Sequence, residues 1–398
     1  MIFKLKYFYQ NMSNINKKVY PERSRMVLVA MSGGVDSSVA AALLKEEGYE
    51  VHGAHMLCWD GCENNGDKQD AMSVAARLEI PFYTFDFRKE YKKSVYEYMV
   101  REYKAGRTPN PDVMCNKTIK FGIFLDRALA MGFDFIATGH YVRREQATHS
   151  GGPPQRDRRE AEGFLSREKP VSSGVCGLRE AHDKSKDQSY FLWTLTQDQL
   201  KHSLFPVGNY LKSEVREIAK KFGLPNAAKK DSQGLCFVGK VDFAEFIREA
   251  LPKNPGIVVD STGKKIGEHD GAHFYTLGQR HGLNIGGTAE PLYIAEKQAK
   301  TNTLVVARGN SDPILFKKEL CAENVHWIAE PPAKYPLAVL ARIRYRQPLQ
   351  KCVLQSDYSV IFDNPQKAVT PGQSVVFYVP SEALTKEGLQ MLGGAIIK

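Results

Sequence analysis

The sequence predicts a multidomain α/β plus β protein, with a doubly wound parallel sheet, then a small central domain and a C-terminal β-barrel. Three observations support this. Apolar runs alternate with helical patterns from Met26 to about His140. A segment rich in Gly, Arg, Glu, Ser and Pro breaks the rhythm after about Arg143, and from about Gly256 short alternating runs follow. Alternating strands and helices are typical of an open parallel sheet, and short strands between turns are typical of a barrel.

Each alternation before His140 predicts one strand or one helix. Strands are expected at 26–31, 51–57, 82–87 and 135–138, and helices at 37–47, 67–78, 91–104 and 117–131. Further along, helices are expected at 190–200 and 213–222, and strands at 303–307, 337–345 and 374–379. Parallel sheets bind ligands where their strands end, so the end of the first strand, Met56 and Gly139 are expected to meet at one nucleotide pocket.

The chain is expected to divide into four parts. These are a basic N-terminal extension at 1–25, a catalytic α/β domain at 26–225 with a mobile insertion at about 144–185, a central domain at 226–288 and the barrel at 289–398.

Composition narrows the class of protein. The 398 residues hold 55 Lys plus Arg against 45 Asp plus Glu, and the net charge of +10 suits a nucleic-acid partner. No apolar run approaches the roughly 20 residues that a membrane-spanning helix needs, and residues 1–25 lack a signal-peptide pattern. Seven cysteines in such a chain do not form a disulfide framework, so we expect a cytoplasmic protein whose important cysteines are catalytic or metal-binding.

The most informative motif is Ala-Met-Ser-Gly-Gly-Val-Asp-Ser-Ser at 30–38, between an apolar strand and a helix. Free backbone N–H groups and the positive end of the helix dipole meet there, which favours a phosphate. Its two glycines allow close approach, and its serines can donate to phosphate oxygens or cap the helix. No Gly-Lys-Ser/Thr follows, so this is not the usual nucleotide P-loop. A carboxylate beside a phosphate needs a bridging cation, so Asp36 predicts Mg²⁺.

Two cysteines lie in loops that are stiffened by Pro or Gly and bear lysines. Cys115 ends the run Gly-Arg-Thr-Pro-Asn-Pro-Asp-Val-Met-Cys and is expected just before, or in the first turn of, the helix near Asn116. Cys236 follows Lys-Lys-Asp-Ser-Gln-Gly-Leu. Nearby positive charge lowers a thiol pKa and favours thiolate. A single loop cysteine is usually a bystander, but two of them in a chain with a phosphate loop indicate sulfur chemistry.

Two further features have an alternative reading. Asp112, three residues before Cys115, is either a general acid/base or a turn carboxylate that caps the following helix. Arg342, Arg344 and Arg346 alternate along an expected strand and so would share one face. Such a basic stripe, with a tyrosine beside it, suits a phosphate backbone or is simply a solvated face.

Seven motifs, taken together and in order, resemble the tRNA-specific 2-thiouridylase family of PP-loop ATP pyrophosphatases. They are SGGVDSS, GRTPNPDxxCN, TGHY, KDQSYFL, LFPVG, KKDSxGxCF and TLGQR. The resemblance runs from Met26 to the C-terminus and is interrupted by the long insertion at about 144–185; the first 25 residues depart from it.

The resemblance implies an enzyme, a tRNA-uridine 2-sulfurtransferase. ATP with Mg²⁺ would adenylate the uracil C2 oxygen at the wobble position, and a persulfide would then supply sulfur, releasing AMP and pyrophosphate. Cys236 would carry the persulfide and Cys115 would act as nucleophile, and a disulfide between them would be reset by a reductant. An iron–sulfur cluster at Cys115, Cys236 and an Asp is left open.

The resemblance also implies binding residues and partners. ATP would contact Ala30, Met31, Ser32, Gly33, Gly34, Val35, Asp36, Ser37, Met56 and Gly139. The RNA would contact Asn110, Pro111 and Asp112 at the flipped-out base, and otherwise His140, Lys186, Asp187, Gln188, Arg344, Tyr345 and Gln373. The partners would be Lys, Glu and Gln tRNAs and a sulfur-relay protein or cysteine desulfurase, with a monomeric enzyme. Two other classes remain: a small-molecule ATP pyrophosphatase and a structural tRNA-binding protein.

Overall fold

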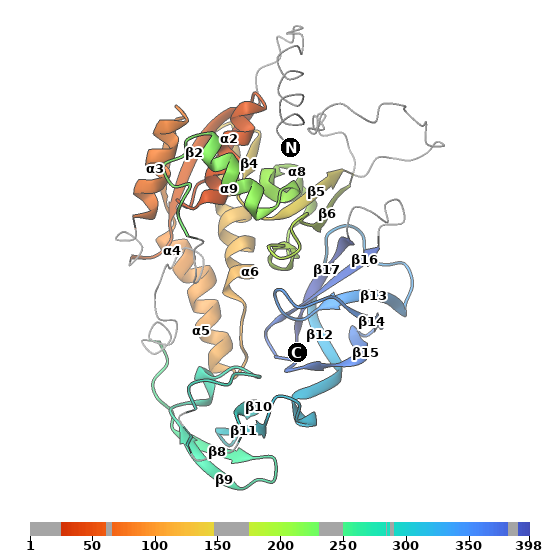
Figure 1. The fold of residues 1–398 in the computed structure, drawn as a ribbon. Coiled ribbons are helices and arrows are strands. Elements are labelled where there is room, and N and C mark those ends of the chain that lie inside the picture. The colour runs from red at the N-terminus through yellow and green to blue at the C-terminus, as the bar shows by residue number, and fades with distance from the viewer. Residues whose placement is uncertain are drawn as a thin grey trace, which may run out of the picture.

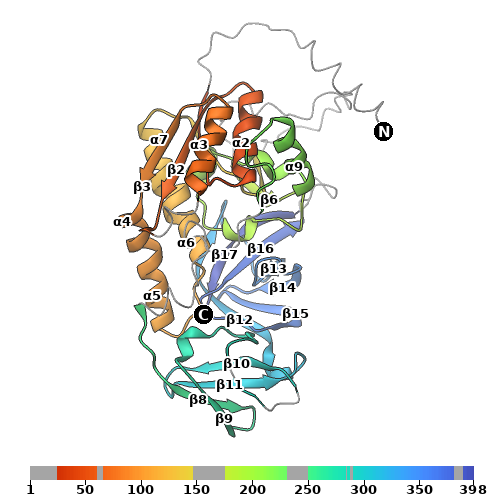
Figure 2. The same ribbon diagram turned by 60° about the vertical axis from the view of Figure 1, so that its left-hand side comes forward.

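The protein was studied as a computed structural model, which describes residues 25–60, 66–146, 175–230, 250–283, 285–286, 290–380 and 389–398. Figures 1 and 2 show an α/β domain beside a β-barrel, with a smaller sheet below both. A long helical segment, α4 (Arg88–Tyr91) to α5 (Glu97–Lys104), runs from the first domain toward the small sheet. In the described part of the chain, no helix has the length and apolar character needed to cross a membrane.

The first domain is built on a five-stranded parallel sheet in the order β3-β2-β1-β4-β7. The strands are β1 (Met26–Ala30), β2 (Glu50–Leu57), β3 (Phe82–Asp86), β4 (Phe135–Ala137) and β7 (Ser203–Leu204). The chain moves outward from β1 on one side and resumes with β4 on the other. This reversal places the switch point, where such sheets bind ligands, between β1 and β4. The predicted doubly wound sheet is confirmed.

Side chains of β1 alternate between two cores, as the two-residue period of a strand requires. Val27 and Val29 pack with α2 (Val35–Glu46), α3 (Asp67–Arg77) and α9 (Lys212–Lys221). Leu28 and Ala30 pack on the other face, with the helices between Arg88 and Ala130. Both faces of the sheet are therefore covered by helices, which fixes the strand ends that carry the site.

Two helices differ from the sequence prediction at their starts. The chain from Pro111 to Ala130 forms α6 (Pro111–Cys115), the π-helical η4 (Asn116–Ile123) and α7 (Phe124–Ala130), whereas the helix was expected from 117. Similarly α4, η3 (Lys92–Tyr96) and α5 begin at Arg88 rather than 91. The single helix expected at 190–200 is wrong. Residues 189–191 form the short 3₁₀ turn η5 (Ser189–Phe191), and the capping box of Thr196 and Gln199 starts the separate helix α8 (Gln197–Lys201).

The small central sheet has the order β10-β11-β8-β9. Its strands are β8 (Gly256–Asp260), β9 (Lys265–His269), β10 (Leu292–Gln298) and β11 (Thr303–Arg308). The predicted boundary at 288/289 would place β10 and β11 in the barrel, but β11 pairs with β8, β10 pairs with β11, and both share the core of the central sheet. These pairings place the end of the central sheet at Arg308.

The C-terminal unit is a closed antiparallel barrel, as predicted. Its six strands pair in the order β12-β15-β14-β13-β16-β17, and β12 pairs with β17 to close the ring. They are β12 (Phe316–Trp327), β13 (Leu337–Arg342), β14 (Gln350–Leu354), β15 (Ser359–Lys367), β16 (Ser374–Pro380) and β17 (Leu389–Ile397).

A hairpin from the expected insertion extends this barrel sheet. β5 (Val142–Gln146) pairs with β6 (Cys176–Glu180), and β6 pairs with β17. β6 is buried along its whole length, including Cys176. The prediction of a mobile insertion at about 144–185 is therefore wrong at both its ends, because 144–146 and 176–180 lie in paired strands. The residues between 147 and 174 lie outside the described part.

Candidate active site

The phosphate-loop motif at 30–38 turns sharply between β1 and α2. Gly33 has φ of +79°, and a Cβ there would lie 2.2 Å from the Asp67 carbonyl oxygen, so only glycine fits. Gly34 is the N-cap of α2, with no side-chain cap. The Ser37 and Ser38 hydroxyls both donate to the Gly34 carbonyl, at 3.1 and 2.9 Å. The expectation that one of these serines caps the helix is wrong, since the helix starts earlier and leaves its first N–H groups without a side-chain cap.

Two other strand ends meet this loop, as the sheet topology predicts. A Cβ on Gly139, just after β4, would lie 2.5 Å from the Ser37 nitrogen, so the two backbones touch. Met56 is buried in β2, and the neighbouring His55 ring nitrogen lies 2.9 Å from the Met31 carbonyl oxygen. The structure thus brings the expected ATP-contact residues together at one edge of the sheet. Their contact with ATP stays a prediction.

Asp36 has a cationic partner that the sequence analysis missed. Lys212 Nζ, at the start of α9, lies 2.6 Å from Asp36 Oδ1, and the Tyr141 hydroxyl donates to the same oxygen at 2.8 Å. The Lys212 side chain is 12% exposed, so its charge is held at the loop rather than in open solvent. A lysine at this position can neutralise a phosphate that the loop binds. Its place at the head of an expected helix was the available sequence signal.

The donor set at Asp36 fits a cation that is shared with phosphates. Mg²⁺ is commonly held by one or two carboxylates together with substrate phosphates and water. Asp36 supplies one such carboxylate, and its other partners are Lys212 and Tyr141. No group of three His, Cys, Asp or Glu that could hold a metal occurs among the residues described here.

The chain just before Cys236 is fastened to the same loop. Lys229 pairs with Asp67 at 2.6 Å and Asp70 at 2.5 Å, and its ammonium also donates to the Gly33 carbonyl at 3.3 Å. The Asn226 amide donates to that carbonyl too, at 3.0 Å. Cys236 lies outside the described residues, seven positions after Lys229. An extended chain of that length spans at most about 25 Å, so chain length alone keeps Cys236 within about 25 Å of Lys229 at the phosphate loop.

Cys115 is the last residue of α6, not part of a loop. The Asn110 side chain caps this helix by accepting from the Val113 N–H at 3.3 Å, and Pro111 occupies its first position. Asn-Pro is a helix-start signal that the sequence analysis read as a loop. Cys115 is buried, and it is not bonded to any of the four other cysteines in the described part of the chain. The π-helical η4 follows at once, a geometry that often marks functional sites.

Asp112 lies in the first turn of α6 and is half-buried. Because Asn110 is the cap, the helix-capping alternative for Asp112 is not what the structure shows. A carboxylate near the positive end of a helix is stabilised by the dipole. The acid/base role of Asp112 stays a prediction.

Three of the expected RNA contacts are engaged inside the protein. His140 is buried with Nδ1 at 2.8 Å from the Thr138 hydroxyl, and burial together with Lys120 holds its pKa well below the ordinary value. Asp187 accepts from the Ser189 hydroxyl at 2.7 Å and pairs with Arg342 at 3.2 Å. The Gln188 side chain accepts from the Tyr141 N–H at 2.9 Å. Contact of these residues with RNA stays a prediction.

The expected arginine stripe is wrong. β13 ends at Arg342, which is buried and paired with Glu180 and Asp187. Arg344 lies in the turn beyond, where its guanidinium donates to the carbonyls of Leu277 and Ala368 at 2.9 and 3.0 Å. The three arginines share no face because the strand ends before the second of them. The alternative of one solvated face fails for the same reason. Tyr345 packs against Phe191, with ring centroids 4.6 Å apart.

Comparison with known proteins decides the family. A tRNA-specific 2-thiouridylase of Pseudomonas paraeruginosa is 44% identical over 391 residues, which cover 95% of each chain. One from Geobacillus thermodenitrificans is 44% identical and covers 92% of this chain and 94% of its own. The chain belongs to the tRNA-specific 2-thiouridylase family. It is therefore an enzyme of the sulfurtransferase class.

Three domain families match along the same chain. They are a tRNA methyl transferase HUP domain at 25–240, a tRNA methyl transferase PRC-barrel domain at 244–308 and an aminomethyltransferase β-barrel domain at 317–397. The second match ends where β11 ends, and the third spans the closed barrel. Among solved structures, a U34-tRNA thiolase of Methanococcus maripaludis with its [4Fe-4S] cluster covers 62% of this chain and 70% of its own at 15% identity, with a TM-score of 0.33.

Proposed function

We propose that this enzyme thiolates C2 of the wobble uridine in tRNA at the expense of ATP. The observation that carries the proposal is the joint presence of an uncapped helix start at a Gly-Gly loop, with Lys212 beside it, and of Cys115 on a Pro-started helix. Sequence similarity over nearly the whole length to 2-thiouridylases supports it. Methyl transfer, which two domain-family names mention, requires neither a pyrophosphate site nor a second thiol.

The first step makes the C2 oxygen a leaving group. The oxygen attacks the α-phosphorus of ATP, an O–P bond forms, and pyrophosphate leaves with the electrons of the broken P–O bond. The N–H groups at the start of α2 and the Lys212 ammonium are placed to stabilise the developing charge. Mg²⁺, when bound with the nucleotide at Asp36, would neutralise phosphate charge. Asp112 is our candidate to move the base proton.

The second step delivers sulfur from a persulfide on Cys236. Either the Cys115 thiolate attacks the Cys236 sulfur and expels hydrogensulfide, which displaces AMP from C2, or the persulfide displaces AMP and Cys115 then attacks the Cys236 sulfur. Both routes form a Cys115–Cys236 disulfide and leave the sulfur doubly bonded to C2. A two-electron thiol reductant then resets the pair.

The partners in this proposal follow from the same chemistry. The sulfur source is a protein persulfide, from a sulfur-relay protein or a cysteine desulfurase. The substrates are the Lys, Glu and Gln tRNAs, and the enzyme acts in the cytoplasm as a monomer. The basic excess of the chain, +10, favours a polyanionic substrate.

One experiment tests the proposal. The protein is incubated with unmodified tRNA, ATP, Mg²⁺ and a persulfide donor, and the nucleosides are analysed by mass spectrometry for 2-thiouridine. Pyrophosphate release without RNA and without thiolation would instead indicate a small-molecule ATP pyrophosphatase. RNA binding without ATP turnover would indicate a structural tRNA-binding protein.

The Arg344→Gln variant should bind tRNA more weakly, and its salt dependence should fall by about one counterion-equivalent, if this guanidinium reaches a phosphate. Pyrophosphate release per bound tRNA should be unchanged. The measurement is the slope of log Kd against log salt concentration, with Lys351→Gln on the exposed side of β14 as the charge-matched control. An unchanged slope would leave Arg344 only the role that its bonds to Leu277 and Ala368 show, which is to join the central sheet to the barrel.

A further inference from the structure

Thr108, in the segment that leads into the Cys115 helix, is held by the central sheet and the barrel. Thr108 is buried, and all three of its polar groups have partners from elsewhere. Its N–H donates to the Pro371 carbonyl at 2.9 Å, and its carbonyl accepts from the Gln373 amide at 2.9 Å. Its hydroxyl lies 3.4 Å from the Lys297 ammonium of β10.

The barrel contributes the larger share of this contact. The Gln373 amide nitrogen donates to the carbonyls of both Thr108 and Pro109, at 2.9 and 3.0 Å. Gly372 has φ of +92°, and a Cβ there would lie 2.8 to 3.0 Å from three backbone atoms of Thr108. The two backbones therefore pack directly against each other, and only glycine permits that approach.

The central sheet holds the same residue through its hydroxyl group. Lys297 also donates to the Tyr275 carbonyl at 3.0 Å, so its ammonium bridges Tyr275 and Thr108. Gly106 lies close to Ala299, where a Cβ on the glycine would be 3.5 Å from the alanine methyl. Thr108 is thus clamped between β10 and the turn before β16.

Rigid geometry connects the clamp to Cys115. Pro109 and Pro111 fix their own φ angles and restrict the residues before them. Asn110, between the two prolines, caps α6, and Cys115 ends that helix. A shift of Thr108 relative to the barrel is therefore transmitted to the helix that carries the nucleophile, because the backbone between Thr108 and α6 is stiff.

We propose that Gln373 and Lys297 are positioning residues, which set the Cys115 helix according to the placement of the barrel and the central sheet. The role rests on the proposed function, since it links the units expected to bind RNA to the thiol that reacts. The Gln373 amide nitrogen donates to the carbonyls of Thr108 and Pro109, whereas a tRNA contact was expected at this residue. Docking of RNA on the barrel would then align α6 through Thr108.

The test measures amide hydrogen exchange in the peptide covering 106–116, without RNA or ATP. Gln373→Glu turns the donating amide into a carboxylate facing two carbonyls, and Gln373→Met removes the donor at similar size. Both variants should exchange this peptide about tenfold faster than the wild type. Gln350→Glu, the same chemical change at a half-buried residue whose amide donates to the Pro348 carbonyl at 2.9 Å, should not.

The second readout separates positioning from RNA contact. In Lys297→Met, at a residue where no RNA contact is expected, the turnover rate for 2-thiouridine should fall about tenfold, while the Kd for tRNA stays within about twofold of the wild type. A raised Kd with unchanged turnover in this variant would show that Lys297 acts on RNA binding and would overturn the proposal. Unchanged exchange at 106–116 would overturn it as well.

Two further provisions let the experiment decide for or against the proposal even if one variant does not fold or the enzyme is inactive. If Gln373→Glu does not fold, Gln373→Met and Lys297→Met carry the test, and Lys297→Met should also loosen 106–116 while barrel peptides exchange normally. The exchange readout involves no catalysis. A wild-type protein that fails to thiolate tRNA would overturn the proposed function, and the clamp would be judged by exchange alone.

Discussion

The Cys115→Ser variant is expected to lose 2-thiouridine formation by at least about a thousandfold while it still releases pyrophosphate. Serine keeps the shape of this buried side chain, so the helix should be undisturbed, but it cannot form or resolve a disulfide. ATP chemistry takes place at the 30–38 loop, on other elements. The measurement is thiolated nucleoside by mass spectrometry alongside pyrophosphate release, with Cys321→Ser, an exposed barrel cysteine, as the matched control.

The same reasoning predicts a cross-link. When the wild type turns over without reductant, peptide mapping should find a Cys115–Cys236 disulfide, and Cys115→Ser should retain a persulfide on Cys236. Such a bond requires Cα atoms within about 7 Å, so the chain after Lys229 must bring Cys236 to α6 in one state. Cys352 is an unsuitable partner, because burial raises the pKa of its thiol to about 12. Continued thiolation with neither cross-link nor persulfide would contradict the two-cysteine route and favour a metal cluster.

The second large effect is expected at the phosphate loop. Asp36→Ala should abolish pyrophosphate release, and Lys212→Met should lower its rate by about 10²- to 10³-fold, the usual cost of removing one preorganised charge-stabilising group. In both variants the affinity for tRNA should stay nearly intact, since both side chains lie at the edge of the parallel sheet rather than on the barrel.

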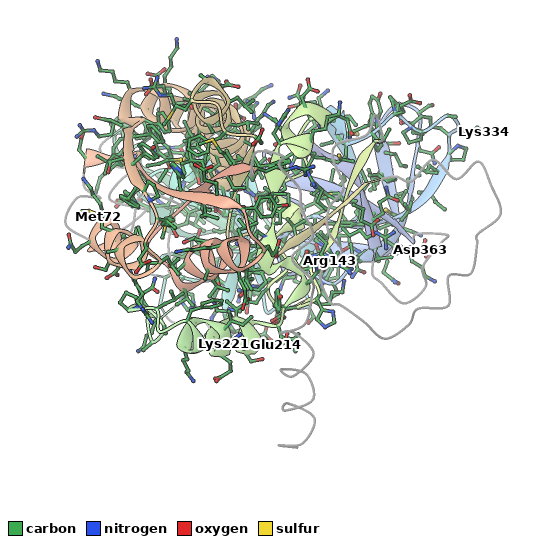
Figure 3. The ribbon with its side chains drawn as sticks, turned by 90° about the horizontal axis from the view of Figure 1, so that it is seen from above. Met72, Arg143, Glu214, Lys221, Lys334 and Asp363 are labelled. Atoms are coloured by element: carbon green, nitrogen blue, oxygen red, sulfur yellow. The ribbon has the colours of Figure 1, made fainter. Side chains whose placement is uncertain are left out.

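The two variants should differ in their response to Mg²⁺. Lys212→Met keeps the carboxylate, so its dependence on Mg²⁺ concentration should resemble that of the wild type, whereas excess Mg²⁺ should not rescue Asp36→Ala. Lys221→Met is the control on the same helix, and Figure 3 shows Lys221 and Glu214 pointing outward from α9. Normal pyrophosphate release by Asp36→Ala would contradict the assignment of the 30–38 loop as the phosphate-binding site.

The features that the sequence predicts correctly depend on residues that lie close together along the chain. The loop at 30–38 was recognised because a buried strand, two glycines and a helix follow one another within a few residues, and Gly33 indeed needs its positive φ. The parallel sheet was predicted because apolar runs typical of strands alternate with helical patterns. The start of α6 at Pro111 also has a local signal, Asn110 followed by proline, but two prolines in a short stretch are also typical of a loop.

The predictions that are wrong or missing concern residues and strands whose partners lie far away in the sequence. Lys212 reaches Asp36 across 176 positions, and its place at the head of an expected helix does not indicate that Asp36 is its partner. Arg342 looked like one member of a surface stripe, yet its partners are Glu180 and Asp187, 162 and 155 positions away. Strands β10 and β11 have ordinary β patterns, and only their pairing with β8 assigns them to the central sheet.

The hairpin of β5 and β6 makes the chain unusually tolerant of alteration at one point. Gln146 and Cys176 face each other in register, and the two strands continue the barrel sheet through β17. The ends of the intervening stretch are thus fixed by paired strands, and the entropic cost of closing a loop grows only slowly with its length. Residues 147–175 could therefore be exchanged for a two-residue Asn-Gly turn, or for a folded reporter domain whose own ends lie close together, without a change to the parallel sheet, α6 or the barrel. That makes this point a natural site for tagging the enzyme internally.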